Sequence, residues 1–121
     1  MGRFADAWER GDIDDLLALL TDDARITMPP VPDEYRGHAA IAALLENRFA
    51  LRPDGILLVP TRANGQPAFG CYFRDPQAPI ARAHGILVLT LAGDRISAVT
   101  RFLDNAVLPR FGLPRTVRDR D

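Results

Sequence analysis

The sequence predicts one α+β domain over residues 1–121, in which a curved antiparallel sheet wraps on helices to form a cone. Helical patterns occupy the first part of the chain, and the second half alternates strands with turns, an order typical of α+β folds. A length of 121 residues suits a single core. Because a strongly twisted sheet on one long helix leaves an open mouth, we expect a small molecule to bind there.

The first two helices are expected at residues 4–10 and 13–20. Phe4 and Trp8 are four residues apart, which places them on one helical face. Asp12 is a good N-cap for the second helix, and residues 21–23 are expected to end it. The apolar residues of this helix have the spacing of an amphipathic stripe: Ile13, Leu16, Leu17 and Leu20.

A short strand at residues 24–28 is expected to stop at the prolines of residues 29–32, which force a stiff, extended segment. This segment should hold Tyr35 at a fixed position. A third helix is expected at residues 38–51. Its stripe at helical spacing consists of Ile41, Leu44, Leu45 and either Arg48 or Phe49.

The residue pattern in the second half of the chain predicts four consecutive strands. Strands at residues 56–63 and 66–73 flank Asn64-Gly65, which is a strong hairpin signal. Pro60 places the first of these strands at a sheet edge or at a bulge, since proline cannot donate to the ladder.

The central hairpin is expected at residues 80–105, with its turn at residues 92–94. The run 86–91 is apolar at both parities except for one threonine, so this strand should lie mid-sheet with cover on both faces. Residues 107–114 should wrap over the domain, and residues 115–121 are charged and expected to fray.

The composition excludes several function classes. Lys+Arg is 15 and Asp+Glu is 16, so the net charge of -1 leaves no basic footprint for nucleic acid and no membrane patch. The single cysteine, Cys71, excludes an internal disulfide and favours a cytoplasmic protein. No run approaches the ~18 apolar residues that a membrane span requires. No metal spacing, phosphate loop or dinucleotide motif is present, so no cofactor and no metal are expected.

Four short motifs resemble one protein family: Met28-Pro29-Pro30, Tyr35-Arg36-Gly37, Asn64-Gly65-Gln66-Pro67-Ala68 and Phe111-Gly112-Leu113-Pro114. With the helical pattern of residues 4–24, they make the chain similar to SnoaL-like domains of the nuclear transport factor 2-like superfamily. The narrowest resemblance is to the SnoaL-like domain of some extracytoplasmic-function sigma factors of actinobacteria. The resemblance implies a cystatin-like α+β roll, polyketide cyclase-like or ketosteroid isomerase-like chemistry, and a homodimer formed through the open sheet face.

The chain departs from this family at two positions. Glu34 stands where an aromatic residue is expected before Tyr35, and Arg101 stands where catalytic members carry the first acid of an acid-aromatic-aromatic-acid ending. Only the second acid, Asp104, remains. A water-activating pair of Arg101 and Asp104, as in epoxide hydrolysis, would need a second aspartate that is not evident.

Asp104 and His84 are the candidate catalytic residues. A carboxylate in an apolar cavity has a raised pKa and can transfer protons near neutral pH, but Asp104 could equally cap the turn after its strand. His84 could act as a base, or it could be a surface or core histidine, because strand parity does not show which face it occupies. The candidate substrate-binding residues are Trp8, Met28, Glu34, Tyr35, Tyr72 and Arg101.

Two functions follow from these residues. The first is cofactor-free acid/base catalysis, such as cyclisation, isomerisation or proton abstraction, on a small and largely apolar organic substrate. The second is a non-catalytic sensing or regulatory domain, which the sigma-factor resemblance and the missing acid at Arg101 favour. Both functions predict the same apolar pocket, and neither involves nucleic acid binding by this domain.

Overall fold

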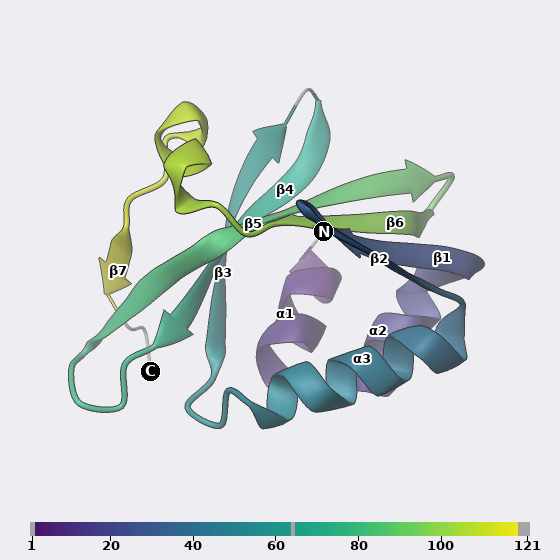
Figure 1. The fold of residues 1–121 in the computed structure, drawn as a ribbon, viewed down its shortest axis with the longest axis horizontal. Coiled ribbons are helices and arrows are strands. Elements are labelled where there is room, and N and C mark those ends of the chain that lie inside the picture. Colours follow the sequence, from purple (N-terminus) through teal and green to yellow (C-terminus); the bar gives the residue numbers. More distant parts are fainter. Residues whose placement is uncertain (1, 64, 119–121) are drawn as a thin grey trace.

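A computed structural model describes residues 2–63 and 65–118 of the chain and confirms the α+β fold, with helices on one side of a curved sheet (Figure 1). The sheet does not close into a barrel. Its strand order is β2-β1-β6-β5-β4-β3, with β7 paired to β5. The strands are β1 (Leu20–Met28), β2 (Val31–Arg36), β3 (Ile56–Ala63), β4 (Gln66–Arg74), β5 (Ile80–Ala92), β6 (Arg95–Phe102) and β7 (Thr116–Arg118).

The sheet is mixed, because β1 pairs with β6 in parallel while the other neighbouring strands pair in antiparallel. The β3 strand lies at one edge, as Pro60 predicts. The prolines after Met28 lead into β2 at the other edge, where Tyr35 pairs with Ile26. The turn predicted at Asn64-Gly65 includes residue 64, which lies outside the described residues.

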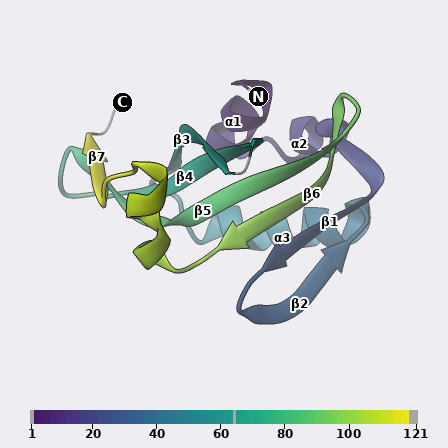
Figure 2. The same ribbon diagram turned by 90° about the horizontal axis from the view of Figure 1, so that it is seen from above.

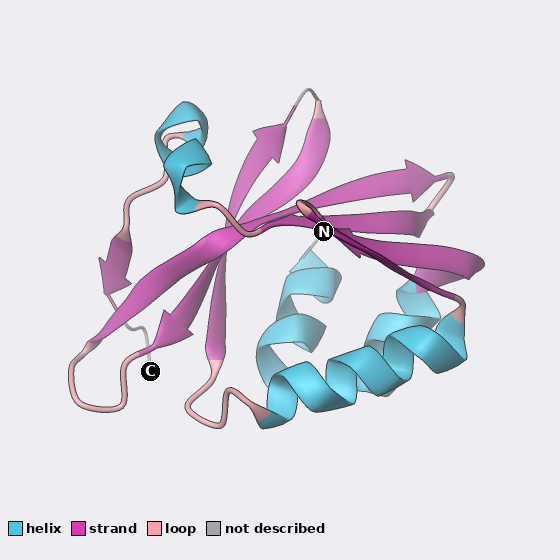
Figure 3. Ribbon diagram, viewed as in Figure 1, coloured by secondary structure: helices cyan, strands magenta, loops and turns pink. Residues whose placement is uncertain are grey.

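The helices α1 (Gly2–Arg10), α2 (Ile13–Leu19) and α3 (His38–Ala50) all lie below the sheet in the view of Figure 3. Asp12 caps α2 as predicted, since its carboxylate accepts the amide of Asp15 at 3.0 Å. The prediction for residues 21–23 was wrong: they belong to β1, which begins directly where α2 stops. Figure 2 shows the curvature of the sheet over α3.

The two faces of the sheet bury two separate apolar clusters, which confirms the predicted cover on both sides of β5. Alternate residues of β5 serve them: Leu87 and Leu89 pack toward the helices, whereas Ile86 and Val88 pack toward the opposite face. Cys71 is buried in the helix-side cluster.

The opposite face is covered by the 3-10 helix η1 (Asn105–Phe111) and the segment after it (Figure 1). Leu108 and Leu113 are buried there against Tyr72. The predicted final strand was too long, since β6 ends at Phe102 and η1 begins at Asn105. Residues 116–118 form β7 rather than a frayed tail, and residues 119–121 lie outside the described part of the chain.

A β-bulge in β5 decides which side chains face the helices. Gly70 pairs with Ile86 and Tyr72 pairs with Ala83, so Cys71 lies opposite two residues, His84 and Gly85. Gly85 has a φ of +84°, a conformation that favours glycine. The extra residue reverses the alternation, so that His84 faces the helix side although Ala83 and Ile86 both face the other.

Asn105, the first residue of η1, secures this bulge. Its side-chain oxygen accepts the Gly85 amide at 2.7 Å, and its side-chain nitrogen donates to the Ala83 carbonyl at 3.0 Å. The side-chain amide of Asn105 therefore satisfies the hydrogen-bonding capacity of two backbone groups at the irregular point of the ladder. Residue Asn105 thus fixes the backbone that carries His84.

Candidate functional site

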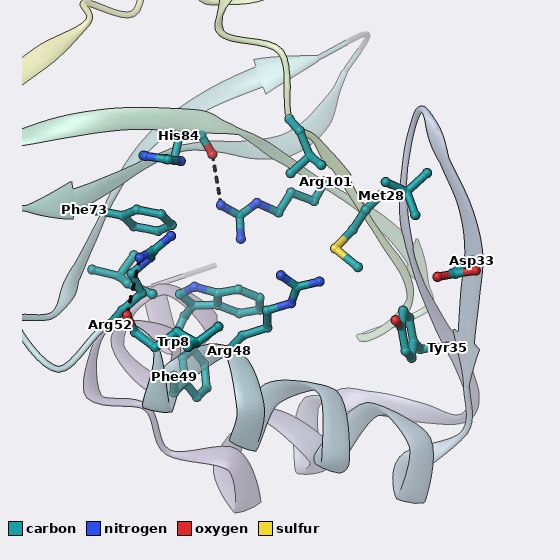
Figure 4. Close-up of a pocket in the computed structure, with 14 residues that line it drawn as sticks. Trp8, Met28, Asp33, Tyr35, Arg48, Phe49, Arg52, Phe73, His84 and Arg101 are labelled. Carbon is teal, nitrogen blue, oxygen red and sulfur yellow. Dashed lines mark hydrogen bonds between the residues drawn. The ribbon is translucent and has the colours of Figure 1, made fainter.

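The candidate site is a pocket at the mouth of the cone, between α3 and the inner face of the sheet, with a volume of about 190 Å³ (Figure 4). Side chains reach it from α1, the end of α3, the β1–β2 hairpin and the strands β3 to β6. Its lining residues are Trp8, Met28, Val31, Asp33, Tyr35, Arg48, Phe49, Leu51, Arg52, Ile56, Phe73, His84, Arg101 and Leu103.

His84 is exposed at the opening of this pocket, and it lines the pocket because the bulge turns it to the helix side of the sheet. Its ring stacks on Phe73, with centroids 4.1 Å apart. On the other side of Phe73, the Arg52 guanidinium lies 4.0 Å from the ring centroid (Figure 4). Partial burial lowers the pKa of His84 below its usual value, and the charges of Arg52 and Arg101 lower it further. His84 is therefore neutral at pH 7 and able to accept a proton.

The lowered pKa of His84 predicts a pH-dependent stability. The folded protein binds this proton less readily than the unfolded chain, whose histidine pKa is about 6.5, so stability is present above pH ~6.5 and is lost as pH falls through the folded-state pKa. Thermal melts from pH 5 to pH 8 should show a steeper acid loss in the wild type than in His84→Gln. Parallel curves for the two proteins would contradict this prediction.

Three arginines surround the pocket. Arg48 comes from α3, Arg52 from the turn after it, and Arg101 from β6. The Arg101 side chain donates to the His84 carbonyl at 3.1 Å. Among residues 2–63 and 65–118, no carboxylate forms an ion pair with any of the three. The pocket therefore has a positive character that a net charge of -1 for the chain does not reveal.

Four of the predicted substrate-binding residues lie in this lining: Trp8, Met28, Tyr35 and Arg101. Trp8 and Met28 are buried, and Tyr35 is half-buried on β2. The Trp8 ring packs edge-to-face against the Phe49 ring, with the ring centroids 5.5 Å apart. Trp8 therefore belongs to the core as well as to the pocket.

Asp104, Tyr72 and Glu34 lie outside the pocket. Asp104 is exposed, and its carboxylate accepts the Ala106 amide at 2.9 Å as the N-cap of η1, which is the capping alternative. Tyr72 is buried on the opposite face of the sheet, where its hydroxyl donates to the Pro114 carbonyl at 2.7 Å. Glu34 is exposed beside Arg25 and Arg36, at 3.6 and 3.4 Å.

The SnoaL-like domain family matches residues 1–99 of the chain. The chain belongs to the SnoaL-like domain family. This SnoaL-like domain is also 39% identical, over 117 residues and 94% of its length, to the ECF RNA polymerase sigma factor SigG of Mycobacterium tuberculosis. It spans 30% of the length of that relative.

Solved structures share the fold of this SnoaL-like domain at low sequence identity. A putative ketosteroid isomerase from Kribbella flavida aligns with a TM-score of 0.65 and 19% identity, over 86% of this chain and 74% of the other. A protein from Catenulispora acidiphila with a ketosteroid isomerase-like fold, solved in complex with trimethylamine, aligns with a TM-score of 0.62 and 18% identity, over 93% and 92%. The nuclear transport factor 2-like fold inferred from the motifs is therefore confirmed.

Sequence reasoning missed most of the charged lining of the SnoaL-like pocket. Arg48 was considered only as a member of the α3 stripe, and Arg52, Asp33 and Phe73 were not assigned to the site. The signal for Arg48 was present, because it continues the spacing of three buried residues of α3, Ile41, Leu44 and Leu45. A charged residue on an apolar stripe indicates either a partner or a cavity.

Two other properties concern the described part of the SnoaL-like domain. Within residues 2–63 and 65–118, no group of three or more His, Cys, Asp or Glu side chains is arranged to hold a metal ion. None of the described helices is long and apolar enough to cross a membrane.

Proposed function

We propose that this SnoaL-like domain is a sensor, which binds a small organic molecule in the pocket and responds by a shift in conformation rather than by a reaction. The observation that carries the proposal is the arrangement of proton-transferring groups. The described lining offers one histidine, His84, and one carboxylate, Asp33, and they lie at opposite ends of the pocket in Figure 4. The third candidate, Asp104, caps η1 on the surface.

The β1–β2 hairpin is the element best suited to respond to a ligand. Its second strand is an edge strand with mostly exposed residues, yet Val31, Asp33 and Tyr35 all contribute to the lining. Edge elements with few buried contacts open at low free-energy cost, so a ligand that contacts them can shift their population. The similarity to the sigma factor SigG supports a regulatory role for such a shift.

A ligand screen tests the sensor proposal. The chain is melted in the presence of a library of small organic molecules, and each compound that raises the melting temperature is incubated with the protein and followed by mass spectrometry. A sensor should return the ligand unchanged and show slower amide hydrogen exchange in β2. Chemical conversion of the ligand, or unchanged exchange in β2 on binding, would contradict the proposal.

Catalysis by His84 is the second candidate, because its lowered pKa leaves a neutral base in the pocket at pH 7. Proton abstraction from a carbon acid would then place the developing negative charge near Arg101. If the screen yields a substrate, His84→Gln should abolish its turnover. The control substitution Arg95→Lys, at an exposed residue of β6, should leave turnover intact.

We also propose that the domain forms a homodimer and that it is located in the cytoplasm. Light scattering on the purified chain should give twice the chain mass of 13.3 kDa. A monomer mass at micromolar concentration would contradict the dimer.

A further inference from the structure

The cationic groups of the pocket converge without a partner. Figure 4 shows the Arg48 and Arg101 side chains extending into the same space above the Trp8 ring. Like charges brought together raise the free energy of the folded state. No described carboxylate forms an ion pair with either arginine, and this includes Asp33 of the lining. The C-terminal end of α3 stabilises Arg48 to some extent through its dipole, but it does not explain why Arg101 lies opposite.

Two buried donors of the same pocket also lack an acceptor. Trp8 is 6% exposed, and its indole Nε1 has no hydrogen-bond partner among the described residues; the Nε of Arg101 is in the same state. A buried donor without a partner costs about 1–3 kcal/mol. The two converging guanidinium groups are complementary to an anion, above all to a planar carboxylate, which pairs with guanidinium groups through two parallel hydrogen bonds.

The remainder of the lining is apolar and restricts the rest of the ligand. Met28, Phe49, Ile56 and Leu103 contribute carbon surface next to the arginines. A volume of about 190 Å³ is smaller than the ~300–1,000 Å³ of pockets for drug-sized ligands. An inorganic anion would leave this apolar surface uncovered, whereas a small organic acid covers it.

We propose that the pocket binds a small hydrophobic monocarboxylate, with the carboxylate between Arg48 and Arg101 beside the Trp8 ring, and the hydrocarbon body against Met28 and Leu103. The proposal rests on the sensor function and names its class of ligand. The sequence predicted a small, largely apolar ligand. The proposal keeps the apolar body of that ligand and adds a negatively charged head group. Arg52, held on the Phe73 ring at 4.0 Å, adds positive potential at the rim.

The chain provides a direct reporter for this site, because Trp8 is its single tryptophan. The protein therefore has one indole N–H signal in a nitrogen-correlated NMR spectrum and one source of tryptophan fluorescence. Titration uses three acids (benzoate, phenylacetate and isovalerate), their neutral primary amides, and inorganic phosphate, all at constant ionic strength. At least one acid should shift the indole N–H signal and raise the melting temperature, while its amide and phosphate should bind at least ~10-fold more weakly.

Matched variants separate the head-group contacts from a general effect of charge. Arg48→Gln and Arg101→Gln should each weaken binding of the acid by about 10-fold or more and leave the binding of its amide unchanged. Arg95→Gln makes the same change of charge on the exposed end of β6 and should leave the affinity for the acid within about 2-fold. Circular dichroism melts of the three variants establish that each is folded before titration.

Three outcomes would overturn the carboxylate proposal: equal binding of acid and amide, equal binding of phosphate, and no shift of the indole N–H by any of the acids. Equal binding of acid and amide would leave the sensor function standing, because the pocket would still take a small organic molecule. Failure of the sensor function would appear separately, as turnover of a bound acid or as unchanged hydrogen exchange in β2.

Discussion

Gly85→Ala is expected to destabilise the domain by more than about 4 kcal/mol, which is exceptional for one methyl group. A Cβ at this position would overlap the backbone carbonyl oxygen of Phe102 on β6. The φ of +84° adds strain for any L side chain, on the order of 1–2 kcal/mol. Because the obstacle is backbone in the neighbouring strand, neither group can move aside without opening the sheet. A thermal melt should show a fall of at least ~15 °C or no cooperative transition.

Gly93→Ala is the matched control for this prediction. Gly93 lies in the turn between β5 and β6 with a φ of +66°, and a Cβ there would meet nothing within 4 Å. The control therefore carries the backbone strain without the overlap, and we expect a loss of about 1–2 kcal/mol. Equal losses of unfolding free energy in the two variants would contradict the prediction. They would mean that the backbone at Gly85 moves to relieve the overlap at little cost in free energy.

The elements of the fold could be predicted because each has a strong local signal. The α2 helix follows from one apolar stripe behind an N-cap at Asp12, and β5 follows from an apolar run at both parities. The boundaries were less certain where two signals compete. Residues 21–23 resemble a helix end, but they lie inside β1, between Leu20 and Arg25, which both pair with β6. Such pairing involves residues far away in the chain.

The site could be predicted only in part, because its orientation depends on the bulge. Strict alternation along β5 would place His84 on the same face as Ile86 and Val88, away from the helices. The extra residue at Gly85 reverses this, and its partner Asn105 lies 20 residues further along the chain. No local pattern in the sequence reports such a contact. Asp104 was the stronger candidate from sequence because it follows an apolar strand, yet the strand stops at Phe102 and leaves Asp104 to cap η1.

The charge of the pocket also depends on three separate elements. Arg48, Arg52 and Arg101 are dispersed in a chain whose acids and bases nearly balance, so composition indicates neither an anionic nor a cationic ligand. Only the tertiary fold brings Arg48 of α3 and Arg101 of β6 into the lining of one pocket. A charge count is informative about extended partners such as nucleic acid, but it does not limit the charge of a small ligand.

Asn105→Ala is expected to cost about 2–4 kcal/mol and to disturb the pocket from outside it. The substitution leaves the Gly85 N–H and the Ala83 C=O without their partner, and each unsatisfied group costs about 1–3 kcal/mol where water does not reach it. The melting temperature should fall by ~8–16 °C. The bulge should also loosen, so the ring protons of His84, which lie over Phe73 at a centroid distance of 4.1 Å, should shift toward their free values in the NMR spectrum.

Asp104→Ala, one position earlier, is the control that separates the bulge from the cap of η1. It removes one exposed hydrogen bond to the Ala106 amide, a loss of about 1 kcal/mol for an N-cap, and it touches neither Gly85 nor Ala83. The His84 ring signals should therefore keep their positions in this variant. If both variants moved these signals alike, the orientation of His84 would depend on η1 as a whole, and the two hydrogen bonds of Asn105 would not be what turns the histidine into the pocket.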